Sequence, residues 1–342
     1  METQEEQTNR MAEEDVLEEQ EVASEAPTSH FWRTFVRKKV GMLGLFMLVS
    51  TILVAIFAPW IAPYDPYESV DATAADVMAP PSAAHPLGQD DIGRDVLSLT
   101  IYGARVSLLV GFAASIIIVV LGCVVGLTAG YAGGRTDLGL MRITDAILVI
   151  PALPLMLVVI SVAGRSLNNI ILIIGLLSWT YMARVVRAQV LSVKERQFVM
   201  RARALGVASL GIVIVHVLPQ VLPVIFAEAT LDVSFAILSE ATLSFLGLGD
   251  PTLVSWGSML NRAFMRGAVT KGAWWYLIPP GVALAWVTLG LVLVSNAVQE
   301  IVNPRLQTHH LFDERKIVSL RGLVSKRRAP ADAKPVLNEP SG

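Results

Sequence analysis

The sequence predicts an all-α integral membrane protein with six membrane-spanning helices. Hydrophobic residues make up 54% of its 342 residues, and charged residues make up only 16%. Backbone groups in lipid must form hydrogen bonds within their own segment, so apolar runs near the roughly 20 residues needed to cross a bilayer are expected to be helices. Five such runs contain no Asp, Glu, Lys or Arg: residues 40–64, 106–134, 146–164, 166–183 and 272–299.

A sixth apolar run, residues 217–249, contains three carboxylates, Glu228, Asp232 and Glu240. A charged carboxylate at the centre of a bilayer costs about 2.5–3.5 kcal/mol on insertion scales. We therefore expect this run to span the membrane with its carboxylates facing protein or water. Glu240 is interpreted first as a structural residue.

Proline and glycine residues predict where the helices end or bend. The first span is expected to end within residues 59–63, where two prolines remove backbone donors. The glycines at residues 133–134 are expected to close the second span in a tight turn with positive φ angles. Pro151 and Pro154 are expected to kink the third span. Residues 249–275 are too polar to span and too aromatic for a plain linker, so we expect them to be partly folded.

The charge distribution predicts the orientation of the chain. Basic residues near membrane ends mark the cytoplasmic side. Four of them precede the first apolar run: Arg33, Arg37, Lys38 and Lys39. The segment after that run, residues 64–98, contains seven acidic side chains and one basic one, Arg94. With six spans, both termini are predicted to be cytoplasmic.

The two ends of the chain differ from its apolar centre. Residues 1–29 contain ten acidic side chains and one basic one, which predicts a disordered acidic tail. Residues 304–342 have no apolar period and are expected to form a loose cytoplasmic tail. Between them, residues 30–103 are expected to form the first transmembrane helix and an extracytoplasmic segment. Residues 104–303 are expected to form the core transmembrane domain, with five helices.

No catalytic or metal-binding motif is present in the sequence. It contains no Walker-type phosphate loop, no His-Glu-x-x-His and no Gly-x-Ser-x-Gly. The single cysteine, Cys123, excludes a disulfide within the chain and lies in a predicted span. We therefore expect a transport subunit rather than an enzyme, with no cofactor, no metal and no energy source in the chain itself.

The strongest functional signal is the predicted cytoplasmic loop at residues 191–216. Residues 193–205 contain good helix formers and place Phe198, Ala202 and Leu205 on one stripe. Gly206 is expected to end this helix in a left-handed conformation, and a second helix is expected to start at residue 209. The loop would present small and apolar side chains to a partner. The alternative is an ordinary basic loop at the membrane surface.

This loop resembles the cytoplasmic coupling loop of ABC-importer permeases, in which Glu-Ala-Ala and a nearby Gly are followed by His-x-Leu-Pro. Here Met200-Arg201-Ala202 stands where the family has Glu-Ala-Ala, so the acidic residue is absent. Further segments across residues 31–306 resemble the dipeptide/oligopeptide/nickel permease group: His85-Pro-Leu-Gly88, Gly93-Arg-Asp-Val-Leu97, Tyr102-Gly-Ala-Arg105, Leu243-Ser-Phe-Leu-Gly-Leu-Gly249 and Asn303-Pro-Arg305.

The resemblance implies a type I ABC importer permease fold in the cell membrane and, as the function, import of dipeptides or oligopeptides. It implies a heterodimer with a second homologous permease, two ABC ATPase subunits that bind ATP and Mg²⁺, an extracytoplasmic solute-binding protein and membrane lipid, but no nucleic acid. It also implies that one set of loop residues couples to the ATPases: Phe198, Arg201, Ala202, Ala204, Leu205, Gly206, His216, Leu218 and Pro219.

Two questions stay open at the level of sequence. Glu228 and Asp232 lie one helical turn apart, so they either line the translocation path or pack between helices. Asp145 either contacts substrate or bonds to an arginine of a neighbouring helix. The rival function is an ion-coupled secondary transporter that works without an ATPase. That class usually has two repeated halves, and no inverted repeat is seen in these six spans.

Overall fold

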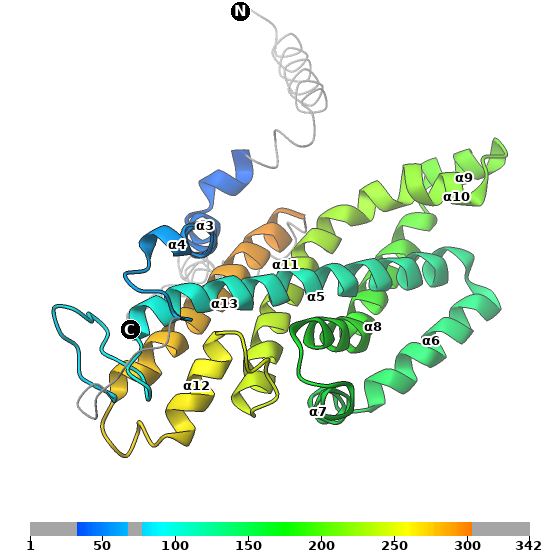
Figure 1. The fold of residues 1–342 in the computed structure, drawn as a ribbon. Helices are drawn as coiled ribbons and strands as arrows, with labels where there is room; N and C mark the ends of the chain where they lie inside the picture. Colours follow the sequence, from blue (N-terminus) through cyan, green and yellow to red (C-terminus); the bar gives the residue numbers. More distant parts are fainter. Residues whose placement is uncertain (1–32, 68–76, 303–342) are drawn as a thin grey trace, which may run out of the picture. The chain divides into compact units, whose positions relative to one another are not determined.

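The structure is a computed structural model that describes residues 33–67 and 77–302. All the regular elements in these two ranges are helical (Figure 1). Five of the described helices are long and apolar enough to cross a membrane, which confirms the all-α membrane fold. They are α3 (Lys39–Ile56), α5 (Val96–Ala132), α8 (Leu167–Lys194), α11 (Leu218–Phe245) and α13 (Trp274–Val302). The tails predicted for residues 1–29 and 304–342 lie outside the described residues.

The third predicted span is broken rather than kinked. Two helices, α6 (Gly134–Val149) and α7 (Ala152–Ala163), meet at an angle of 84° and make a sixth crossing only if they are counted as one span. Pro151 has no N–H group and disfavours helical geometry in the residue before it. Ile150 is accordingly extended, with ψ 125°. The sequence predicted the place of the bend but not its size.

Other boundaries differ less from the prediction. α5 begins at Val96, well before the charge-free run, because the Asp95 side chain accepts a hydrogen bond from the Ser98 amide and caps the helix. Gly133 and Gly134 have φ angles of 64° and 55°, as the predicted turn requires. The first span ends at Ile56, and a separate single turn, α4 (Ala58–Ile61), contains the first proline. Residues 249–275 are partly folded as α12 (Trp256–Met265).

A seam of glycines joins α5 to α8. Gly122, Gly126 and Gly130 recur every fourth residue and face α8. A Cβ atom on Gly126 would lie 2.6 Å from the carbonyl oxygen of Ala183, and one on Gly130 would lie 2.8 Å from Val190. Small residues at this spacing let two membrane helices approach backbone to backbone. The two helices are therefore packed closely along this length.

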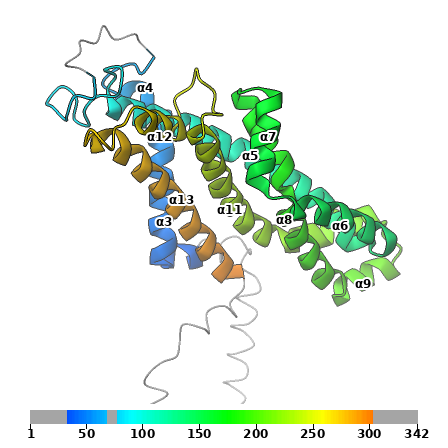
Figure 2. The same ribbon diagram turned by 90° about the horizontal axis from the view of Figure 1, so that it is seen from below.

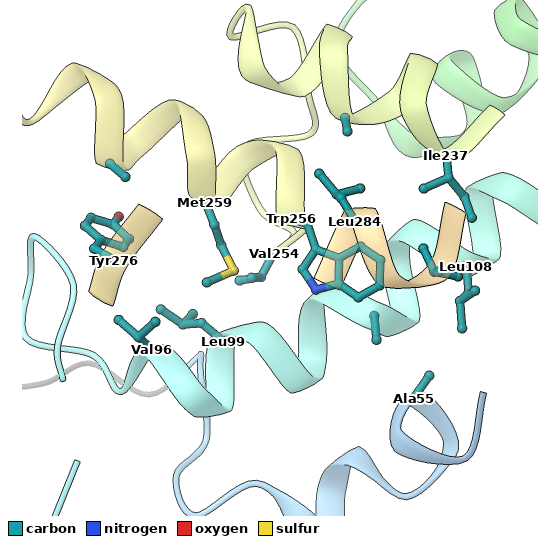
Figure 3. Close-up of a cluster of buried hydrophobic side chains, with 14 of the residues drawn as sticks. Ala55, Val96, Leu99, Leu108, Ile237, Val254, Trp256, Met259, Tyr276 and Leu284 are labelled. Carbon is teal, nitrogen blue, oxygen red and sulfur yellow. The ribbon is translucent and has the colours of Figure 1, made fainter. Parts of the chain in front are cut away.

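The largest buried side chain, Trp256, joins α12 to three spanning helices. Its side chain lies between α5, α11 and α13, close to Leu108, Ile237 and Leu284 (Figure 3). The indole Nε1 donates to the carbonyl oxygen of Thr100 at 2.9 Å, so burial leaves no unpaired donor. This contact fixes α12 against the ends of the spanning helices.

The spanning helices run between two ends, which we name by the short helices they carry. The α12 end contains α4, α12, the turn at residues 90–95 and the loop at residues 246–255 (Figure 2). The α9 end contains α9 (Gln197–Ala204), α10 (Ser209–Gly211) and a π-helix, η1 (Ile212–Val217). Helix α8 connects the two ends, with its first residue near Asp250 and its last residue before α9.

Candidate functional site

The α9 end is shaped by a glycine-terminated helix. Gly206 has a φ angle of 77°, and its N–H bonds to the carbonyl of Arg203. The N–H of Val207 bonds to the carbonyl of Ala202, which completes a Schellman motif. No atom lies within 4 Å of a Cβ built on Gly206, so the need for glycine is conformational and not steric. The predicted helix end is therefore present in the structure.

The predicted stripe of Phe198, Ala202 and Leu205 does not form one surface. Ala202 is buried with Val199 in the chain's own core, next to Ile212. Leu205 is 83% exposed, because it is the C-cap and lies beyond the last helical residue, where the helical stripe no longer continues. Ala202 therefore supports the loop from inside and does not offer a docking surface.

The other predicted loop residues divide in the same way. Arg201, Ala204, Gly206 and Pro219 are exposed, Phe198 is 38% exposed, and His216 and Leu218 are partly buried. Sequence reasoning missed five exposed apolar residues of this loop: Met200, Val207, Leu210, Ile214 and Val215. For Val207 and Leu210 the available signal was their position just after the predicted helix end at Gly206.

Two basic residues attach the loop to the end of α5. The Arg203 guanidinium lies 5.7 Å from the ring centroid of Tyr131, and the Lys194 ammonium donates to the carbonyl of Gly130 at 3.0 Å. Within the part of the chain that the structure describes, the exposed side chains of Arg196 and Arg201 have no ion-pair partner. Their charge is available to another molecule.

Glu228 and Asp232 line one cavity of about 390 Å³, which is bounded by the break between α6 and α7, by α8 and by α11. Tyr181 and Ser178 of α8 face the same space. The lining is mostly apolar, and one oxygen of Asp232 and the hydroxyl of Ser178 are buried without a hydrogen-bond partner. The cavity thus offers polar groups in an otherwise apolar wall.

Asp145 lies apart from that cavity. Arg184 donates to Asp145, and Arg187 binds Asp137 through two hydrogen bonds of 2.5 and 2.6 Å. Both ion pairs connect α6 to α8. Among the described residues, no group of three or more His, Cys, Asp or Glu could hold a metal ion.

The sequence matches known transport proteins over most of its length. A family model described as "Binding-protein-dependent transport system inner membrane component" matches residues 118–308. A second, described as "N-terminal TM domain of oligopeptide transport permease C", matches residues 26–81.

Three relatives illustrate the similarity. The di/tripeptide transport system permease protein DppC of Pseudomonas aeruginosa is 35% identical over 289 residues, which cover 82% of this chain and 93% of that protein. The oligopeptide transport system permease protein OppC of Bacillus subtilis is 36% identical, covering 80% and 88%. The dipeptide transport system permease protein DppC of Escherichia coli K12 is 37% identical, covering 82% and 94%. With the helical fold, these matches show that the chain belongs to the binding-protein-dependent inner membrane components, as a multi-pass inner membrane protein of the DppC/OppC type with the type I ABC-importer permease fold.

Proposed function

We propose that this chain is a permease subunit of an ATP-driven importer of dipeptides or oligopeptides, and that ATPase subunits act on it through the α9 end. The names of the relatives support the peptide substrate, since all three refer to peptide transport. The proposed assembly is a heterodimer with a second permease, two ATPases that bind ATP and Mg²⁺, and an extracytoplasmic solute-binding protein. In this assembly the α9 end and both termini are cytoplasmic, which agrees with the basic residues of that end.

The exposed apolar side chains of the α9 end carry this proposal. Leu205 is 83% exposed, Leu210 is 71% exposed and Met200 is 48% exposed, although the loop also carries exposed arginines. Apolar side chains gathered in a polar surround are typical of a protein interface. Because Val199 and Ala202 hold the same helix in the core, a partner that binds the exposed face would move α9 and the helices joined to it.

The cavity between α6, α8 and α11 is the proposed part of the translocation path. Glu228 and Asp232 would face the N-terminal ammonium group of a passing peptide. Closure of the ATPases would push α9, and a rigid-body rotation of packed helices would open the path to alternate sides of the membrane. Asp145 has a helix-connecting role in this scheme, through its bond to Arg184.

The test is the Gly206→Leu variant in the complete importer, reconstituted in proteoliposomes. A side chain at φ 77° strains the Schellman turn and misplaces Leu205, so peptide uptake and transport-coupled ATP hydrolysis should both fall at least about tenfold. Gly139→Leu is the matched control, since it also has no atom within 4 Å of its Cβ position but has no positive φ angle. Wild-type uptake by a correctly inserted Gly206→Leu protein would contradict coupling through this loop.

A second measurement separates the importer from the ion-coupled rival. The purified chain alone in liposomes should accumulate no peptide against a gradient, because it contains no Walker-type motif. Concentrative uptake by this preparation would favour the secondary transporter.

A further inference from the structure

A second cavity, of about 440 Å³, lies at the α12 end and has no role in the function proposed so far. Four segments that are distant in the sequence line it. Arg165 comes from the α7–α8 connection, Asp250 from the loop after α11, Arg262 from α12, and Tyr67 and Arg94 from the segment between α4 and α5. Three arginines therefore meet at one hollow.

The charges in this cavity are not balanced. Arg94 is paired with the fully buried Asp90 at 2.6 Å. Arg165 and Arg262, by contrast, have no carboxylate within ion-pair distance in the described ranges of the chain. With Arg94 neutralised by Asp90, the described lining residues leave two guanidinium groups without an ion-pair partner against one carboxylate, Asp250, so this lining is net positive.

Asp250 does not serve as the counter-ion of either arginine, because other groups occupy its oxygens. One oxygen accepts from the amide and the hydroxyl of Thr252, at 3.0 and 2.6 Å, and the other accepts from the amide of Leu167 at 3.2 Å. Partial burial raises the pKa of Asp250, but these hydrogen bonds outweigh it and hold the pKa below its ordinary value. The loop is thus tied in place without using the guanidinium donors.

Two further polar lining groups are also occupied. The Asn261 amide donates to the carbonyl of Phe245 at 2.6 Å, and Ser258 forms the capping box of α12 with Ser255. Among the charged lining groups that the structure describes, the guanidinium donors of Arg165 and Arg262 are unused. Planar guanidinium forks bind a carboxylate with two parallel hydrogen bonds, which makes a carboxylate the ligand that this cavity fits best.

The position of the cavity relates it to the direction of transport. Arg165 precedes α8, whose 28 residues extend about 42 Å and end at the α9 end. If ATPases act at the α9 end, as proposed above, the cavity faces the side from which the solute arrives. A hollow of this size is in the range of small-ligand pockets, whereas a protein partner would be expected to use a broader, flatter surface.

We propose that this cavity receives the C-terminal carboxylate of the incoming peptide, with Arg165 and Arg262 as its ligands. The proposal rests on peptide import as the function of the assembly. The other source of a carboxylate, an acidic side chain of the solute-binding protein, is an outcome of the test below.

The experiment uses the complete importer in proteoliposomes with its own binding protein and compares uptake of trialanine with uptake of trialanine amide. In the Arg165→Gln/Arg262→Gln variant, the ratio of free-acid to amide uptake should fall about tenfold relative to wild type, which is the loss expected for a charge-assisted hydrogen-bonded pair. The same binding protein delivers both peptides, so its own preference cancels in this comparison. Lys271→Gln is the control, because it removes an exposed cation of the α12–α13 connection that does not line the cavity.

The affinity of the solubilised complex for the binding protein is measured in parallel. An unchanged uptake ratio overturns the proposal. An equal loss for both peptides with weaker binding-protein affinity also overturns it and assigns the arginines to docking. If wild type imports neither peptide, the proposed function itself fails. Should the double variant not assemble, the Arg165→Gln variant alone tests the same ratio, because Arg165 is exposed and its loss should leave folding intact.

Discussion

At the turn of residues 90–95, in the α12 end, charged side chains are bonded within the chain, whereas at the α9 end several of them extend into solvent. Asp91 accepts from the hydroxyl of Tyr276 at 2.8 Å and pairs with Arg266 at 3.0 Å. Asp90, which is fully buried, pairs with Arg94 and also accepts the amides of Ile92 and Arg94. At the α9 end, Arg201 has no such partner among the described side chains, and Leu205 is 83% exposed.

The difference indicates how the two ends are stabilised. The turn at residues 90–95 is held by contacts within the chain, so substitutions in it should act mainly on stability. The exposed face of the α9 end contributes little to the core, so its substitutions should act mainly on an interaction with another subunit. Three substitutions test this contrast, and they are ordered by the size of the expected effect.

Asp90→Ala should cause the largest loss of stability, about 3–5 kcal/mol in the free energy of unfolding, because it leaves Arg94 as an uncompensated charge with a side chain only 12% exposed. Thermal unfolding of the detergent-solubilised protein measures it. Asp65→Ala is the control, since Asp65 is exposed and bonds only within its own turn, and should cost at most about 0.5 kcal/mol. Equal losses in the two variants would show that the Asp90–Arg94 ion pair does not hold the turn at residues 90–95.

Leu205→Ala should leave the unfolding free energy within about 0.5 kcal/mol of wild type, yet weaken ATPase binding about tenfold or more. Val199→Ala, six residues earlier and fully buried, should instead lower the free energy of unfolding by about 2 kcal/mol and leave ATPase binding nearly unchanged. Thermal unfolding and co-purification with the ATPase measure the two effects. A large loss of stability in Leu205→Ala would show that the exposed face of the α9 end contributes to packing within the chain itself.

Asp250→Asn should cause the smallest loss in the free energy of unfolding, and this loss should depend on pH. The hydrogen bonds of Asp250 lower its pKa in the folded protein, so its stabilising contribution is complete above the ordinary value of 3.8 and is lost as the pH falls through the folded-state pKa. The variant should be less stable at pH 7 by under about 1 kcal/mol, since the group is only partly buried. The difference should vanish well below pH 3.8. If wild type and variant differ in stability by the same amount at both pH values, the lowered pKa of Asp250 is not the cause of the difference.

Much of the fold was predictable because membrane helices are defined by local composition. Charge-free runs located the spans, and Gly133 located the turn after α5. The charge-free run alone does not locate the start of α5, because Arg105 ends that run while the helix extends past this arginine to the cap at Asp95. The angle at Ile150 was not predictable, because a proline determines where a helix breaks, while packing against other helices determines the angle.

The candidate site was predictable only in part, for a related reason. Gly206 could be assigned from the chain itself, because a left-handed turn is a local property. The inward orientation of Ala202 depends on the phase of α9 relative to Ile212, which periodicity alone does not give. The cavity of Arg165 and Arg262 joins residues almost 100 positions apart, so no local pattern contains it.

The glycine seam between α5 and α8 has a mechanical consequence. Where Gly126 and Gly130 meet Ala183 and Val190, no flexible side chains separate the two helices. A displacement applied to the Lys194 terminus of α8 is therefore shared by both helices, which move as one rigid unit. Since the 37 residues of α5 extend about 55 Å, a displacement at the α9 end would be transmitted along α5 toward the α12 end without a hinge in between.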